Sequence, residues 1–135
     1  MSFSDDIKKF ANKTNKTADE VAEGLFIKLF SAIIMDTRVD TGRLRGNWQL
    51  TMDYPATSET DREDLVPQYQ EGGRAWSEVQ SGINPQRVNY LTNNLPYAKR
   101  WEDVDGMVST NIVRIKRTLR EAIRDVTGQY RSGFH

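Results

Sequence analysis

Carboxylates are the side chains of this sequence with the most potential for chemistry. Asp36 and Asp40 stand four residues apart at the end of an expected helix, and Asp103 and Asp105 stand just before Gly106. The first pair could hold a metal, but short acidic side chains at a helix end more often cap the helix or form a turn. The second pair resembles the start of a calcium loop but lacks the further ligands. We therefore expect these residues to be structural, and we predict no metal and no cofactor.

Histidine and cysteine contribute almost nothing. The one histidine is His135, the last residue, and there is no cysteine. This composition rules out disulfides and thiolate metal sites and argues against a catalytic triad or a histidine metal site, because a terminal residue is usually frayed. We predict that the chain is not an enzyme. An enzyme with an unrecognised carboxylate site is the third and least favoured hypothesis.

Charge and hydropathy narrow the choice of partners. The 135 residues fit one domain, with a flexible tail from about residue 128, and lysine plus arginine equals aspartate plus glutamate at 19 each. This balance argues against nucleic acid or an anionic membrane as the main partner. The most apolar run, residues 25–35, is too short to span a bilayer, and no signal peptide is visible. We expect synthesis in a cytoplasm and no membrane partner.

Helical patterns open the chain. Ser4 is placed to cap a first helix, and Thr17 begins a capping-box pattern followed by apolar residues at helical spacing up to Ile34. The apolar stripe widens toward its end, which predicts a helix buried on more than one side or shared with another subunit. Residues 40–42, Asp-Thr-Gly, then form a turn from which Arg43 and Arg45 leave on one side.

Two strands are predicted, at residues 48–54 and 86–92. Between them, residues 56–73 are acidic and long, which predicts a projecting, mobile loop. Because two strands do not make a stable sheet alone, either this loop or a neighbouring subunit is expected to supply a third. Short helices are expected at residues 74–83 and 97–102, with a tight turn at residues 103–106.

The last helix is predicted over residues 108–126, with Gly128 ending it. Its exposed side is basic. Residues 114–135 carry a net charge of +4, whereas residues 53–79 carry −5. Opposite patches on one chain are what a head-to-tail ring requires. The whole pattern predicts an α+β fold, a small antiparallel sheet packed against long N-terminal and C-terminal helices, with a long acidic loop.

Two stretches resemble a single family, in order and in spacing. Residues 39–48, Val-Asp-Thr-Gly-Arg-Leu-Arg-Gly-Asn-Trp, are similar to the Pro-Val-Asp-Thr-Gly-x-Leu-Arg-x-Ser-Trp signature of tailed-phage neck and tail-completion proteins of the minor tail protein Z type. Residues 90–102, Tyr-Leu-Thr-Asn-Asn-Leu-Pro-Tyr-Ala-Lys-Arg-Trp-Glu, are similar to the family's Tyr-x-x-Asn-x-x-Pro-Tyr-Ala-x-x-x-Glu, and residues 106–108 match its Gly-Met-Val. The chain departs from the pattern at Arg38, where the family has proline, and in the shortened segment 103–105.

The resemblance implies a structural virion protein at the head–tail junction, without catalytic residues. It implies a homo-oligomer, a ring of six around the DNA path, with DNA in its lumen. Its other partners would be neck and tail proteins: a connector or head-closure protein, a tail terminator or a tail tube. The residues carried over as assembly positions are Asp40, Thr41, Gly42, Arg43, Arg45, Trp48, Asn94, Pro96, Tyr97, Glu102 and Gly106. Among these, Glu102 is a candidate partner for an arginine.

The alternative to this assembly protein is a nucleic-acid-binding accessory protein. It would use the basic face of the last helix, at Arg114, Arg117, Arg120 and Arg124. The two hypotheses differ in their salt dependence, because binding through phosphate contacts weakens steeply as salt rises.

Overall fold

The described residues form six helices and one two-stranded antiparallel sheet, which confirms the predicted α+β fold. The computed structural model describes the backbone of residues 2–132 and the side chains of residues 2–124. In chain order the elements are α1 (Phe3–Thr14), α2 (Ala18–Asp36), α3 (Arg43–Gly46), β1 (Trp48–Met52), α4 (Arg74–Gly82), β2 (Asn89–Asn93), α5 (Ala98–Asp105) and α6 (Met107–Ser132).

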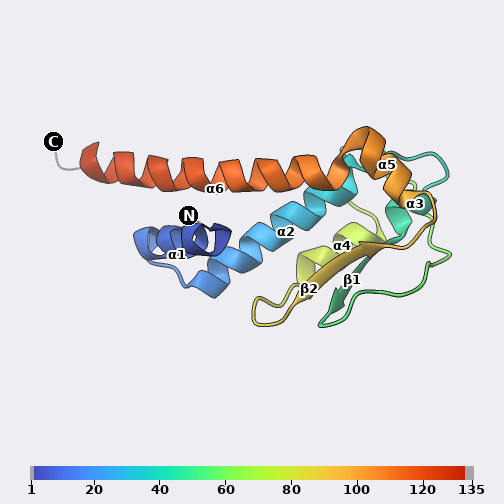
Figure 1. Ribbon diagram of the computed structural model, residues 1–135, viewed down its shortest axis with the longest axis horizontal. Helices are drawn as coiled ribbons and strands as arrows, with labels where there is room; N and C mark the ends of the chain where they lie inside the picture. Colours follow the sequence, from blue (N-terminus) through green and yellow to red (C-terminus); the bar gives the residue numbers. More distant parts are fainter. Residues whose placement is uncertain (1, 133–135) are drawn as a thin grey trace.

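The elements gather in two groups that α2 connects (Figure 1). α1 lies along α6 at one end, and the sheet lies with α3, α4 and α5 at the other. Each group has its own cluster of buried side chains. The smaller cluster is formed by Ile7, Ala11, Val21, Leu119 and Ile123. The larger one is formed by Phe30, Ile33, Ile34, Leu44, Trp48, Ala75, Val79, Ile83, Leu95, Ala98 and Met107.

Helix α2 packs against α1, α4 and α6, so the prediction of a helix buried on several sides is confirmed. Thr17 caps it with the predicted capping box, in which its hydroxyl accepts from the Glu20 N–H. The first helix begins earlier than predicted, because Ser2 rather than Ser4 is its cap. None of the helices among the described residues has the length and apolar character needed to cross a bilayer.

The sheet pairs β1 with β2 so that Trp48 lies opposite Asn93 and Leu50 opposite Leu91. Directly opposed residues share a face of the sheet, and these two pairs face α4 and the larger core cluster. Both strands are shorter than predicted at one end. Neither the segment 56–73 nor any other described residue adds a third strand.

Three local predictions are wrong. Arg43 and Arg45 do not leave the Gly42 turn on one side, because residues 43–46 form the helical turn α3, in which Leu44 and Arg45 are buried and Arg43 is half-exposed. The expected tight turn at residues 103–106 is the last turn of α5, which Gly106 ends with φ +63°. Helix α6 passes through Gly128, where a glycine costs only about 1 kcal/mol. The flexible tail remains a prediction, because residues 133–135 lie outside the described part.

The acidic segment does not project from the body, so that prediction is also wrong. Residues 56–73, which we call the strap, have no helix or strand, yet they pack against α2 and α3. The Asp64 N–H donates to the Gly42 carbonyl at 2.8 Å, and the Tyr69 N–H donates to the Met35 carbonyl at 2.7 Å. Gln68 donates to the Asp36 carbonyl, so the strap satisfies free carbonyls at the end of α2.

We therefore expect the strap to be ordered in the isolated chain. The amides of Asp64 and Tyr69 should exchange with deuterium much more slowly than those of Thr57 and Glu59, for which the described residues provide no acceptor. Residue-resolved hydrogen exchange on the purified protein measures this. Equal, fast exchange at all four amides would restore the prediction of a mobile loop.

Candidate functional site

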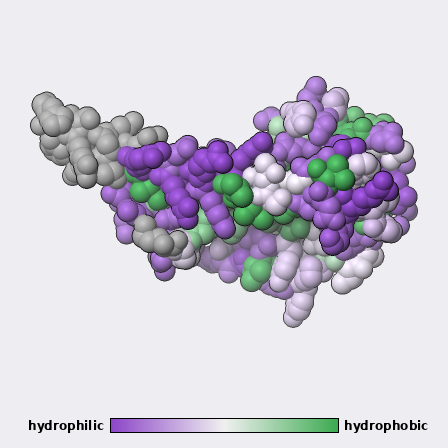
Figure 2. All heavy atoms as spheres, turned by 45° about the horizontal axis from the view of Figure 1, so that its top comes forward, coloured by the Kyte–Doolittle hydropathy of each residue, from purple (hydrophilic) through white to green (hydrophobic). Residues whose placement is uncertain are grey.

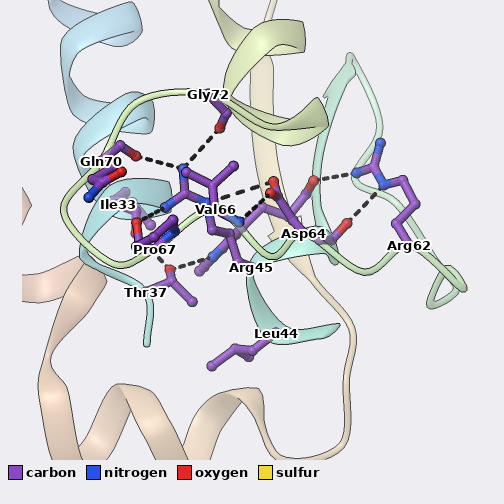
Figure 3. A network of polar contacts seen from close by, with 12 residues as sticks. Ile33, Thr37, Leu44, Arg45, Arg62, Asp64, Val66, Pro67, Gln70 and Gly72 are labelled. Atoms are coloured by element: carbon purple, nitrogen blue, oxygen red, sulfur yellow. Dashed lines mark hydrogen bonds and ion pairs between the residues drawn. The ribbon is translucent and has the colours of Figure 1, made fainter. Parts of the chain in front are cut away.

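Arg45 is the centre around which the strap folds. Its side chain is 0% exposed, and its guanidinium donates to three strap carbonyls: Pro67 at 3.2 Å, Gln70 at 2.7 Å and Gly72 at 2.9 Å. Figure 3 shows the strap curving around this guanidinium. Only a planar, multi-donor group can serve carbonyls that converge from several directions, so arginine is required here rather than lysine.

Asp64 supplies the matching negative charge. Its carboxylate is buried, and its Oδ2 atom lies 3.7 Å from Nε of Arg45, an ion pair without a hydrogen bond between those two atoms. Burial lowers the pKa of the Arg45 guanidinium from its ordinary value, and the charge of Asp64 opposes that shift. The carboxylate fits against the backbone of Gly73, where an added Cβ would lie 2.1 Å from Oδ2.

Arg62 and Asn47 fasten the earlier part of the strap. Arg62 donates to the carbonyls of Gly46 at 2.8 Å and Trp48 at 2.6 Å, and it also pairs with Glu78. Asn47 is fully buried, and its side-chain oxygen accepts from the Thr60 N–H at 2.7 Å. Sequence reasoning missed both roles. The available signal for Arg62 was its position as the only base in an acidic stretch.

Two glycines of the first motif allow this close approach. A Cβ on Gly42 would lie 2.7 Å from backbone atoms of Asp64, and a Cβ on Gly46 would lie 2.6 Å from the Arg62 carbonyl oxygen. Gly42 also has φ +84°, a conformation that side chains other than glycine rarely adopt. The predicted turn at Gly42 is thus present, and the backbone of the strap packs against it.

The two sequence motifs lie side by side. Trp48 of the first is paired in register with Asn93 of the second, and the Asn93 side chain donates to the Leu44 carbonyl at 2.7 Å. Asn94 donates to the carbonyls of Ala56 at 2.8 Å and Ser58 at 3.3 Å. The second motif therefore holds the start of the strap in addition to the first motif.

Trp48 also ties the sheet to the end of α2. Its indole N–H donates to the Thr37 hydroxyl at 2.8 Å, and that hydroxyl donates to the Ile33 carbonyl at 2.7 Å. Thr37 is fully buried and also lies 3.5 Å from the sulfur of Met107, the first residue of α6. One hydroxyl thus joins α2, β1 and α6.

Glu102 has no arginine partner among residues 2–124. Its carboxylate accepts from the backbone N–H groups of Val108 at 2.9 Å and Ser109 at 3.0 Å, so it caps the N-terminus of α6. The candidate pairing with an arginine is therefore wrong. Pro96 and Tyr97 lie exposed before α5, and no side-chain bond anchors Tyr97 in the described part of the chain.

The remaining residues of the first turn are nearer the surface. Asp40 and Thr41 are exposed, and the Thr41 hydroxyl accepts weakly from the Arg43 N–H at 3.4 Å. Arg43 reaches Glu59 of the strap at 3.4 Å, in an exposed pair. Such a pair contributes little stability.

Arg38 and Asp105, which stand where the chain departs from the family pattern, contact each other. Arg38 donates to both carboxylate oxygens of Asp105 at 2.7 Å, and its guanidinium lies 3.7 Å from the ring centre of Trp101. This pair borders a cleft of about 770 Å³ between the end of α2 and the start of α6. Asp36, also in the cleft, is bound by Asn111 and Arg114, so the charges lining it serve mainly to hold the helices together.

The basic face of α6 is exposed, as predicted, but it is not uniform. Arg114 pairs with Asp36 and Arg120 with Asp6, at 3.4 and 3.3 Å. The other three basic residues have no carboxylate partner among residues 2–124. These three are Lys116, Arg117 and Arg124. Figure 2 shows a largely hydrophilic surface along this helix.

Within residues 2–124, no group of three or more acidic or histidine side chains is arranged to hold a metal ion. Comparison with known proteins identifies no matching family model, curated sequence or solved structure. The family relationship therefore stays a prediction from the two motifs.

The buried arginine gives a stability test. Arg45→Met should lower the free energy of unfolding by about 3–5 kcal/mol, because it leaves Asp64 buried without its counter-charge. The matched control Arg43→Met removes a half-exposed arginine two residues away and should cost no more than about 1 kcal/mol. Urea unfolding of both variants makes the comparison. Similar losses in the two variants would contradict the central role of Arg45.

The Arg38–Asp105 pair gives a pH test. Hydrogen bonds from Arg38 lower the pKa of the Asp105 carboxyl. Its stabilising contribution is therefore complete above the ordinary aspartate pKa of about 3.9 and is lost as pH falls through the lower folded-state pKa. Asp105→Asn should destabilise at neutral pH, and the gap from wild type should narrow on acidification. Thermal unfolding at several pH values measures the gap. A gap that widens in acid would refute this assignment, and the exposed Asp103→Asn is the control.

Proposed function

We propose that this chain is a structural virion protein of the head–tail junction of a tailed phage, a neck or tail-completion component that assembles as a ring around the DNA channel. The observation that carries the proposal is the convergence of the two motifs. They stand about forty residues apart in the sequence, yet they pair through Trp48 and Asn93 and jointly hold the strap. A pattern whose parts contact one another is more specific than two unrelated matches.

The use made of the motif side chains also supports an assembly role. The polar groups of Arg45, Trp48 and Glu102 form hydrogen bonds with backbone or side-chain atoms of their own chain. They build a rigid corner on which exposed residues are displayed. A catalytic site would instead direct such groups toward a substrate.

The basic face of α6 supports the alternative, a nucleic-acid-binding accessory protein. Lys116, Arg117 and Arg124 are exposed and unpaired among residues 2–124, and such residues suit phosphate contacts. Their number is small for strong DNA binding, and the balanced charge of the chain gives no general attraction to DNA. We therefore favour the assembly role, in which DNA passes near the protein without being its main partner.

The particle itself provides the test. Electron microscopy of purified virions carrying a tagged copy should place the label at the head–tail junction, and loss of the gene should leave heads and tails unjoined. A tagged capsid protein is the control for labelling elsewhere. Absence of the label from the particle would end this proposal. Tight binding of the free protein to duplex DNA, falling steeply with added salt, would favour the alternative.

A further inference from the structure

The strap has an inner and an outer row of side chains. Burial alternates along residues 61–66, as it does along an extended chain with one buried face. The inner row is fixed by contacts already described, through Arg62 and Asp64. The outer row consists of Asp61, Glu63 and Leu65, all exposed. Because its neighbours in sequence are anchored, the outer row is held in place before any partner binds.

The carboxylates of the outer row have no basic partner among the described residues. Glu59 and Glu78, on either side, pair with arginines of the same chain, whereas neither Asp61 nor Glu63 has a basic partner among the described residues. Leu65 is 67% exposed. Two carboxylates followed by a leucine thus face outward on a rigid backbone.

Helix α6 carries a complementary row. Residues at positions 113, 117, 120 and 124 fall on one stripe of a helix. Val113 at its start is 56% exposed, and the three following positions are arginines. Arg120 forms an ion pair with Asp6 of the same chain, while Arg117 and Arg124 have no carboxylate partner among residues 2–124. The stripe therefore begins with one apolar residue, which is followed by three basic residues.

The two rows match in spacing. Along an extended strap, Glu63 and Asp61 lie about 6.6 and 13 Å from Leu65. Along α6, Arg117 lies about 6 Å from Val113, and the next two arginines lie about 10.5 and 16.5 Å from it. With Leu65 on Val113, each carboxylate meets an arginine within the reach of that long side chain.

These two rows cannot meet within one chain. The strap lies at the end of the molecule that holds the sheet, and most of the α6 stripe extends toward the end that holds α1 (Figure 1). We infer that the outer row of the strap docks on the α6 stripe of a second copy of this chain. Such a contact joins two different surfaces, so it is head-to-tail and closes into a ring if the rotation allows. This inference deepens the proposed function and rests on its self-assembly.

Charge reversal on each surface tests the contact. Glu63→Arg and Arg117→Glu should each weaken self-association of the purified chain about tenfold or more, because each replaces an attraction by a repulsion. A 1:1 mixture of the two variants should recover association, since a reversed strap then meets a reversed helix and the native surfaces meet each other. The double variant should associate alone. Analytical ultracentrifugation over a range of protein concentrations measures each case.

Glu23→Arg and Lys9→Glu are the controls, because they reverse exposed charges on α2 and α1. They should associate like the wild type. Added salt should weaken the wild-type assembly, since exposed ion pairs are screened. Oligomers that persist in both single variants, or a mixture that fails to recover, would overturn the docking while leaving the virion role open. A wild-type chain that stays monomeric at high concentration would also overturn the docking. The proposed function is then tested separately by the position of the label in the virions.

Discussion

A buried guanidinium with few ways to be satisfied constrains this structure. Arg45 is shut away from water, and an unpaired charge in that position would cost several kcal/mol. The chain meets that requirement by bringing three carbonyls and the Asp64 carboxylate to it. A strap without any helix or strand thereby acquires a defined path. The order of this long segment comes from polar satisfaction, because its few apolar residues provide little to bury.

The strap in turn organises the elements beneath it. It satisfies carbonyls at the end of α2 and lies against Gly42 and Gly46. It also donates a hydrogen bond to the Asn47 side chain and accepts one from the Asn94 side chain. The Thr37 hydroxyl links the same region to β1 and to the start of α6. An isolated two-stranded sheet is only marginally stable in water. Here it is stabilised on one face by α4 and the core, and its outer edge near Trp48 is covered by Arg62.

The distribution of charge takes on a different meaning in three dimensions. Residues 53–79 are strongly acidic as a sequence, yet four of their seven carboxylates face arginines of the same chain: Asp53, Glu59, Asp64 and Glu78. Of the three that remain, Asp61 and Glu63 stand together in the outer row of the strap, so the unpaired charge forms a short row rather than a broad patch. A short row on a rigid backbone favours a specific partner over general attraction, because its spacing has to be matched.

The sequence by itself determined the local structure. The capping box at Thr17, helical periodicity and the Gly42 turn are encoded by neighbouring residues, so every helix except α3, both strands and the α+β class could be predicted. Most motif residues were also found from sequence. Only the tertiary structure decided what those residues bind: Arg45 and Asp64 are nineteen residues apart, and Glu102 turned out to cap a helix. The path of the strap was missed for the same reason, since it depends on contacts between distant residues and leaves no periodic pattern in the sequence.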